Sequence, residues 1–315
     1  MGDFKTILVG TDFSRFAGRG VAAAVSMANR FGARRVHLVH VSPAPPMVPL
    51  LDPRKKSVFD RAKKGAEERL EDLEVPKTSV WVSREVRMGA PARELARAAE
   101  SVQADLLVVS RHGSSGLARF VLGSVANSLI RVSTTPVLVV GNDGPPECFE
   151  RIVAAVDLSP ISRSVLTNAI AVAHASAGQL GVLSVFEHPI LSQDPDQLLP
   201  HYLSKDEVDG LGEEHKSEVD ALVEKVPRGG LDVDVHVEAG GPAPARILHN
   251  AEESGADLIV MGTSGSNAWH RMILGSTANH VISKAPCAVL IVPPLARASV
   301  GDETTNDILV PEPGA

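Results

Sequence analysis

The most informative stretch of this chain is LIVMGTSGSNAWHRMILGSTAN, residues 258–279. It begins as a short apolar run, passes through a loop rich in glycine and ends in a segment with helical character. The stretch LLVVSRHGSSGLARFVLGSVAN, residues 106–127, has the same order of features and many of the same letters. Any fold proposed for the chain must therefore provide one arrangement of strand, loop and helix twice.

The repetition extends over almost the whole chain. The matched pairs are ILVGTDFS (7–14) with IVAAVDLS (152–159), GAPARELARAAESVQADLLVVS (89–110) with GPAPARILHNAEESGADLIVMG (241–262), and PVLVV (136–140) with AVLIV (288–292). Self-similarity of this extent is typical of a duplicated domain. We therefore predict two copies of one domain, residues 1–145 and 146–296, followed by a tail of residues 297–315.

Each copy alternates short β-branched runs with helical patterns. In the first copy the runs are TILVG, RVHLVHV, SVWVSREV, DLLVV and PVLVV, and several are apolar throughout, which suits strands covered on both faces. Ser14 and Ser159 stand where the first helix of each copy should begin and are predicted N-caps. Strand and helix in alternation favour right-handed crossovers and a parallel sheet. The predicted class is α/β, with two open five-stranded parallel sheets in tandem.

The glycine loop of the second copy has the chemistry of an anion site. It follows the fourth strand, at the carboxyl edge of the sheet, where open parallel sheets bind ligands. Gly262 and Gly265 are expected to allow positive φ and a close approach of the backbone to a ligand. Gly275, Ser276 and Thr277 open a helix whose N–H groups and positive dipole end attract phosphate. The alternative is structural: the glycines only form a turn, and Ser276 only caps the helix.

Composition narrows the classes of function. A hydrophobic content of 44% and a charged content of 22% are ordinary for a soluble globular protein. The net charge of −7 provides no broad cationic field, so nucleic acid is not expected as a partner. The two cysteines, Cys148 and Cys287, leave no disulfide framework or zinc-ligand spacing, and a reducing cytoplasm is the expected location. No apolar run approaches the ~18 residues of a membrane span, so no membrane partner is expected.

The residues of the second copy resemble those of the universal stress protein family, and the chain looks like a tandem member of it. The family's nucleotide-binding members share Gly, two residues, Gly, nine residues, Gly and then Ser or Thr, and the second copy fits this spacing in full. The family's aspartate at the end of the first strand, which meets the adenosine part of ATP, matches Asp157. Its second-strand valine, which packs near the adenine, matches Val185. The implied fold is the adenine nucleotide alpha hydrolase-like sandwich, and the implied ligand is ATP with Mg²⁺.

The first copy matches the same family pattern with one departure. Asp12 and Val41 occupy the places of the strand-end aspartate and the second-strand valine. The residues of the loop and helix start that keep the spacing are Gly113, Gly123, Ser124 and Val125. Ser110 stands where the first glycine belongs, and its Cβ would crowd a ribose or phosphate if the backbone there required positive φ. Nucleotide binding is therefore expected in the second copy and left open in the first.

The resemblance implies an ATP-binding protein of stress response or signalling with at most slow ATP hydrolysis. Phosphoryl transfer needs a carboxylate to hold the metal, and the loop contains neither Asp nor Glu. Catalytic residues are therefore left unassigned, and Mg²⁺ is expected to arrive with the phosphates. The alternatives are a nucleotide-free protein-interaction module of the same fold and an adenylate-forming enzyme that would release pyrophosphate.

The resemblance also implies an assembly. The last strands of the family's domains pair across a two-fold axis, so residues 136–140 and 288–292 are expected to pair within this chain as an intrachain pseudo-dimer. Left unpaired, such an apolar edge would invite aggregation. Whether two chains pair further as a homodimer is left open.

Asp12 and Asp157 also have a structural explanation. Each stands two residues before a serine, Ser14 or Ser159, at the expected start of the first helix of its copy. A carboxylate in this place can accept a hydrogen bond from the local backbone. The adenosine contact and this local bond are therefore weighed as alternatives.

Overall fold

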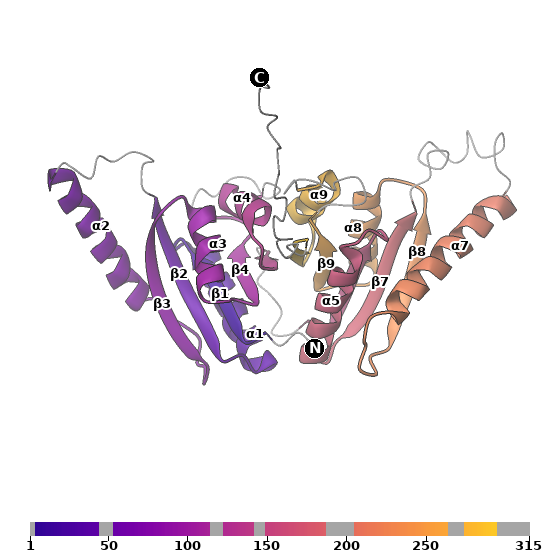
Figure 1. The fold of residues 1–315 in the computed structure, drawn as a ribbon, viewed down its shortest axis with the longest axis horizontal. Helices are drawn as coiled ribbons and strands as arrows, with labels where there is room; N and C mark the ends of the chain where they lie inside the picture. Colours follow the sequence, from indigo (N-terminus) through magenta and orange to yellow (C-terminus); the bar gives the residue numbers. More distant parts are fainter. Residues whose placement is uncertain are drawn as a thin grey trace, which may run out of the picture.

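The computed structural model describes residues 4–43, 53–113, 122–141, 149–186, 205–263 and 274–294. Strands and helices alternate in both copies (Figure 1). The first copy holds β1 (Thr6–Thr11), α1 (Arg15–Phe31), β2 (Arg35–Pro43), α2 (Pro53–Glu71), β3 (Trp81–Gly89), α3 (Pro91–Ser101), β4 (Leu106–Ser110), α4 (Ser124–Val132) and β5 (Val137–Val140). The second holds β6 (Arg151–Val156), α5 (Ser162–Ser176), β7 (Gln179–Phe186), α7 (Lys205–Glu224), β8 (Val233–Ala239), α8 (Ala243–Glu253), β9 (Leu258–Gly262), α9 (Ser276–Lys284) and β10 (Ala288–Val292). The predicted α/β class is confirmed.

The strands form one continuous sheet across both copies. Their order is β3-β2-β1-β4-β5-β10-β9-β6-β7-β8. Paired strands within each copy are parallel, as the alternation of strand and helix predicted. β5 and β10 are antiparallel, with Leu138 opposite Leu290 and Val139 opposite Val289. The predicted pairing of the last strands is confirmed, and the two five-stranded sheets form an intrachain pseudo-dimer.

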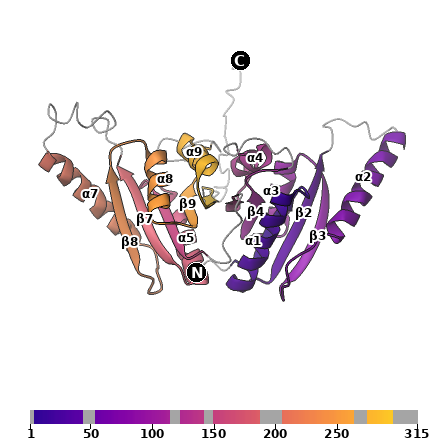
Figure 2. The same ribbon diagram turned by 180° about the vertical axis from the view of Figure 1, so that it is seen from behind.

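Helices cover both faces of the sheet (Figures 1 and 2). Side chains of α1, α2, α5 and α7 belong to one buried core, and those of α3, α4, α8 and α9 to the other. Successive strand residues alternate between the cores, since Ile7 and Val9 lie in the first and Leu8 in the second. A strand buried on both faces needs apolar side chains at every position. This explains the continuous apolar runs of the sequence.

The strand order reverses at β1 and at β6. β1 lies between β2 and β4, and β6 lies between β7 and β9. The helix after β1, α1, packs on one face of the sheet, whereas the helix after β4, α4, packs on the other. The segments that leave the carboxyl ends of the neighbouring strands β1 and β4 therefore diverge toward opposite faces of the sheet. Open α/β sheets bind ligands at this kind of place.

Arg111 crosses the seam between the copies. It follows β4 of the first copy, and its side chain is only 6% exposed. Its Nη1 donates to the carbonyl of Ala285 at 2.8 Å, and its Nη2 donates to the carbonyl of Cys287 at 2.8 Å. Both acceptors belong to the turn between α9 and β10 of the second copy. A side chain next to the first glycine loop thus ties the two copies together.

Cys287, beside this tie, is expected to be unreactive in the native chain. Burial raises the pKa of its thiol to about 12, although the Arg111 charge opposes the shift. Because the thiolate is the reactive form, alkylation at pH 8 should be roughly 10³-fold slower than in the unfolded chain. Iodoacetamide labelling of a Cys148→Ser variant, with and without urea, measures this ratio, and labelling at equal rates in both states would contradict it.

Candidate functional site

The structure brings the strand-end aspartate and the glycine loop of the first copy together. Asp12 follows β1, Gly113 lies three residues beyond the end of β4, and β1 and β4 are paired neighbours. A Cβ built on Gly113 would lie 2.9 Å from Asp12 Oδ2. A side chain at this position would therefore have to displace the Asp12 carboxylate. In the second copy β6 and β9 pair in the same way, and Asp157 follows β6.

The residue after each aspartate has a left-handed backbone. Phe13 has φ 60° and Leu158 has φ 59°, and the two occupy equivalent places. Bulky residues rarely adopt positive φ, and such outliers concentrate at functional sites. Sequence reasoning missed both turns because Phe and Leu, unlike Gly or Asn, carry no signal for this conformation. The strained turn presents Asp12 and Asp157 as exposed residues at the carboxyl edge of the sheet.

The local bonds of the two aspartates, weighed as an alternative, are present. Ser14 N donates to Asp12 Oδ1 at 3.0 Å, and Ser159 N donates to Asp157 Oδ1 at 3.2 Å. Asp157 Oδ1 also accepts from the Ser159 hydroxyl and, at 3.1 Å, from the Ser162 hydroxyl. Each carboxylate is therefore held in a fixed direction by the start of the first helix. This arrangement is compatible with a ligand contact and does not require one.

One of the two predicted N-caps is wrong. Ser14 caps α1, because its hydroxyl accepts from Ala17 N at 3.1 Å. Ser159 does not cap α5, which begins at Ser162 with Ile161 at the N-cap position and no side-chain cap bond. The helix starts later than predicted because the chain first makes a turn in which Ser162 N donates to the Ser159 carbonyl at 2.9 Å. Ser159 serves Asp157 instead.

Gly262 has a different role from the one predicted. It is not among the glycines with positive φ, so the expectation of a left-handed backbone is wrong at this position. Its missing side chain makes room for Ile161, whose Cγ2 would lie 2.9 Å from a Cβ. Ser110, the equivalent residue of the first copy, also lacks positive φ, and its hydroxyl donates to the His112 carbonyl at 2.8 Å. The strain argument against Ser110 therefore falls. Gly265 lies outside the described residues.

The two helices that follow the loops begin as predicted at their glycines. Gly123 is the N-cap of α4 with φ −59°, and Gly275 is the N-cap of α9 with φ −62°, each without a side-chain cap bond. The structural alternative in which Ser276 caps the helix is therefore wrong. Gly123 N donates to the Arg111 carbonyl at 2.8 Å, and Gly275 N donates to the Thr263 carbonyl at 2.7 Å. Each helix start is thus fixed to the first residue after the fourth strand.

The first turns of these helices lie at the surface. Ser124 and Ser276 are exposed, Thr277 is half-buried, and Val125 is 39% exposed although it is apolar. A helix N-terminus presents backbone N–H groups and a positive dipole end. The second-strand valines lie deeper, since Val41 is buried and Val185 is half-buried. The helix start in both copies can therefore accept an anion, at the same edge of the sheet as an exposed carboxylate.

Two histidines near the strand ends were missed by sequence reasoning. His40 Nδ1 lies 2.8 Å from the Thr11 carbonyl, and His215 Nε2 lies 2.9 Å from the Ser184 hydroxyl. His40 is followed by Val41, but its equivalent in the second copy is Ser184, so the comparison of copies gave no signal. His215 comes from α7, outside the matched stretches.

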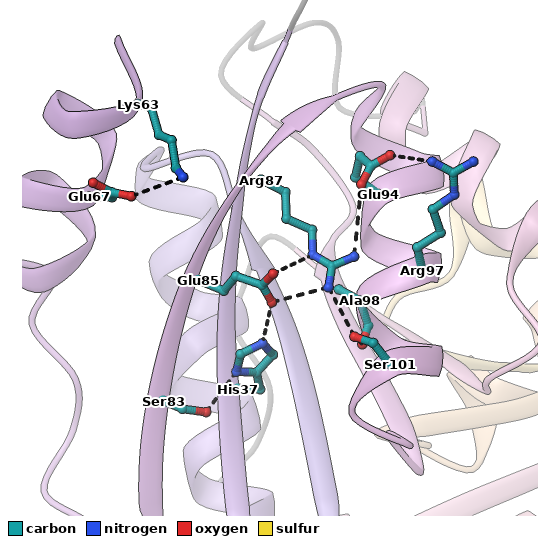
Figure 3. A network of polar contacts seen from close by, with 10 residues as sticks. All are labelled: His37, Lys63, Glu67, Ser83, Glu85, Arg87, Glu94, Arg97, Ala98 and Ser101. Atoms are coloured by element: carbon teal, nitrogen blue, oxygen red, sulfur yellow. Dashed lines mark hydrogen bonds and ion pairs between the residues drawn. The ribbon is translucent and has the colours of Figure 1, made fainter. Parts of the chain in front are cut away.

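A second polar network lies away from this edge, over β2 and β3 (Figure 3). His37 contacts Ser83 at 2.7 Å and Glu85 at 2.9 Å, an order that resembles a Ser-His-acid triad. Glu85 is also paired with Arg87 at 2.8 Å. Burial alone would raise the pKa of Glu85, but the hydrogen bonds from His37 and Arg87 outweigh it and lower this pKa. A weakly basic carboxylate that is already bonded to His37 and Arg87 suits a structural network that holds the edge strand β3.

The described part of the chain lacks two further features. No three His, Cys, Asp or Glu side chains gather there as a metal site. None of its helices has both the length and the apolar character that crossing a membrane requires.

Comparisons with known proteins agree on one family. A sequence model of the universal stress protein family matches residues 3–141 and again 149–293. A universal stress protein of Mycolicibacterium smegmatis is 30% identical over 219 residues, which cover 68% of this chain and 69% of that protein. The universal stress protein E homolog of Haemophilus influenzae is 27% identical over 232 residues, 71% of each chain. A solved universal stress protein from Archaeoglobus fulgidus shares the fold, with a TM-score of 0.63 and 22% identity over 91% of this chain and 96% of that one.

Proposed function

Because the chain belongs to the universal stress protein family and carries its domain twice, we propose that it is a stress-response protein that binds ATP in both copies. One observation supports this most directly. In each copy an exposed strand-end aspartate and a helix that starts at a glycine lie at the carboxyl edge of the sheet, and in the first copy Gly113 of the loop lies against the aspartate. The domain boundaries of residues 1–145 and 146–296 are part of the same proposal.

The proposed roles follow from the chemistry of each group. The phosphates bind at the starts of α4 and α9, where N–H groups and the helix dipole favour an anion. Asp12 and Asp157, as acceptors, face the adenosine part. Mg²⁺ arrives with the phosphates and neutralises part of their charge. Hydrolysis is at most slow, because the loop sequences offer no carboxylate to hold the metal for phosphoryl transfer.

Ser110 does not prevent binding in the first copy. Its side chain already has a place in the structure, because its hydroxyl donates to the His112 carbonyl at 2.8 Å. A serine side chain with ordinary backbone angles is therefore compatible with an open site. We infer that both copies hold nucleotide.

The first test is the nucleotide content of the purified protein. We expect about two adenine nucleotides per chain, one for each site, after denaturation and chromatography of the supernatant or after titration with Mg-ATP. A stoichiometry of one would restrict the proposal to a single copy. No retained nucleotide and no binding of added Mg-ATP would overturn it.

The second candidate function is a nucleotide-free interaction module. The observation in its favour is that Asp157 Oδ1 already accepts bonds from Ser159 and Ser162, so the aspartate has a structural use without any ligand. Under this alternative Asp157→Ala would destabilise the chain without any effect on nucleotide binding. Under the leading proposal the same variant loses affinity for Mg-ATP.

A further inference from the structure

The last carbonyl of the first strand in each copy accepts a hydrogen bond from a side chain of the neighbouring strand. In the first copy His40 Nδ1 donates to the Thr11 carbonyl at 2.8 Å. In the second copy the hydroxyl of Ser184, the residue equivalent to His40, donates to the Val156 carbonyl at 3.0 Å. Ser184 is completely buried, and its hydroxyl lies 2.9 Å from His215 Nε2. The same bond is therefore kept by two different side chains.

These carbonyls directly precede the strained turns that carry the aspartates. The Phe13 ring lies 4.3 Å from the His40 ring between centroids, and Phe13 N donates to Thr11 Oγ1 at 3.1 Å. The Arg69 guanidinium lies 4.3 Å from the Phe13 ring centroid. In the first copy His40 therefore fixes both the peptide before Asp12 and the left-handed residue after it.

In the second copy a histidine from another element performs the supporting role. The Ser184 hydroxyl has one proton, which it donates to the Val156 carbonyl, so it accepts the hydrogen of His215 Nε2. The His215 ring packs against Phe186, with centroids 5.2 Å apart. His40 comes from β2 and contacts the Thr11 carbonyl directly. His215 comes from α7 and acts on the Val156 carbonyl through the Ser184 hydroxyl. The repeated bond with unrelated residues indicates that the site requires it.

Both imidazoles have a lowered pKa, which favours the neutral form near pH 7, and their hydrogen bonds then indicate the tautomers. Burial is the main cause that lowers the pKa of His40; the Arg69 charge adds to it, whereas the bond to Thr11 and the Asp12 charge oppose it. Burial also lowers the pKa of His215, against the Glu218 charge. The proton of neutral His40 then resides on Nδ1 and that of His215 on Nε2.

We propose that His40 and the Ser184–His215 pair are positioning residues for nucleotide binding, because they hold the turns that direct Asp12 and Asp157 toward the ligand. The inference rests on the proposed function, since it assigns a role within the same sites. It adds residues that neither the loop spacing nor the equivalence of the two copies indicates.

The two tautomers allow a crossed test. Asn places an amide nitrogen where His40 has Nδ1, and Gln places one where His215 has Nε2. With the second site blocked by Gly275→Val, His40→Leu should weaken Mg-ATP binding about 3–10-fold, the worth of one hydrogen bond, whereas His40→Asn should stay close to the parent. For the second copy, the first site is blocked by Gly123→Val. His215→Leu should then weaken Mg-ATP binding by a similar factor, whereas His215→Gln should stay close to the parent. Thermal unfolding of each variant checks that it is folded.

A double-mutant cycle separates positioning from general stability. If His40 acts through Asp12, the variant that combines His40→Leu with Asp12→Ala binds Mg-ATP no more weakly than Asp12→Ala alone. Additive losses, or equal affinities for His40→Leu and its parent, would overturn the inference and leave the proposed function standing. Absence of Mg-ATP binding by the native chain would overturn both.

Discussion

Replacing Gly275 by valine is expected to abolish Mg-ATP binding in the second copy, with a loss of affinity of at least about 100-fold. Gly275 is the N-cap of α9, with φ −62° and ψ 155°, angles that valine adopts without strain. The backbone angles therefore permit valine, although at the equivalent Gly123 an added Cβ would lie 3.1 Å from the Arg111 carbonyl and 3.7 Å from Gly113 N. We therefore expect the valine side chain to enter the space between the loop and the helix start, so that a phosphate there loses charge-assisted hydrogen bonds.

Isothermal titration with Mg-ATP measures this loss. The stoichiometry should fall from about two to about one per chain, because the start of α4 in the first copy is untouched. A matched control is Gly210→Val in α7, where an added Cβ meets nothing within 4 Å and binding should not change. Unaltered binding in Gly275→Val would show that the glycine only shapes a turn.

The sequence predicted the parts of the fold that depend on repeated local patterns. Continuous apolar runs identified buried parallel strands because each is covered on both faces, as Ile7 and Leu8 show by belonging to opposite cores. The antiparallel pairing of β5 with β10 followed from the resemblance and the aggregation risk of an uncovered edge. These features are encoded redundantly, by many residues that agree.

The features that sequence reasoning missed depend on single contacts between distant residues. Nothing in the letters around Phe13 indicates a positive φ, since the strain is offset by contacts with His40 and Arg69 from other elements. Gly262 was assigned a backbone role because glycine usually signals positive φ, but the true reason is the approach of Ile161. A comparison of the two copies finds what they share, and these contacts are not shared in sequence.

The sequence predicted which residues belong to the candidate site but not the hydrogen bonds that hold them. The spacing identified Gly123 and Gly275 as helix starts, and both are N-caps. The hydrogen bonds that fix these starts use backbone carbonyls of Arg111 and Thr263, and a backbone acceptor leaves no trace in the sequence. The contact of Arg111 with the second copy is likewise invisible, because the equivalent residue is Thr263.

Replacing Arg111 by alanine is expected to lower the free energy of unfolding by about 2–4 kcal/mol. The variant loses two bonds of a buried guanidinium, to the carbonyls of Ala285 and Cys287, and leaves those acceptors facing an empty space. Arg111→Lys should recover only part of this loss, because one ammonium cannot reproduce a fork that donates to two carbonyls. Urea denaturation followed by circular dichroism measures the free energy of unfolding of the parent, Arg111→Ala and Arg111→Lys.

Thr263→Ala is the matched control for this seam. Arg111 N donates to the Val140 carbonyl at 2.8 Å and Thr263 N donates to the Val292 carbonyl at 3.2 Å, so the two backbones are equivalent and only the side chains differ. The control should cost about 1 kcal/mol or less. Arg111→Ala keeps the backbone carbonyl that accepts from Gly123 N, so the start of α4 stays fixed and the substitution tests the seam alone. Equal losses of stability in Arg111→Ala and Thr263→Ala would show that the two hydrogen bonds of Arg111 add nothing to the seam that joins the copies.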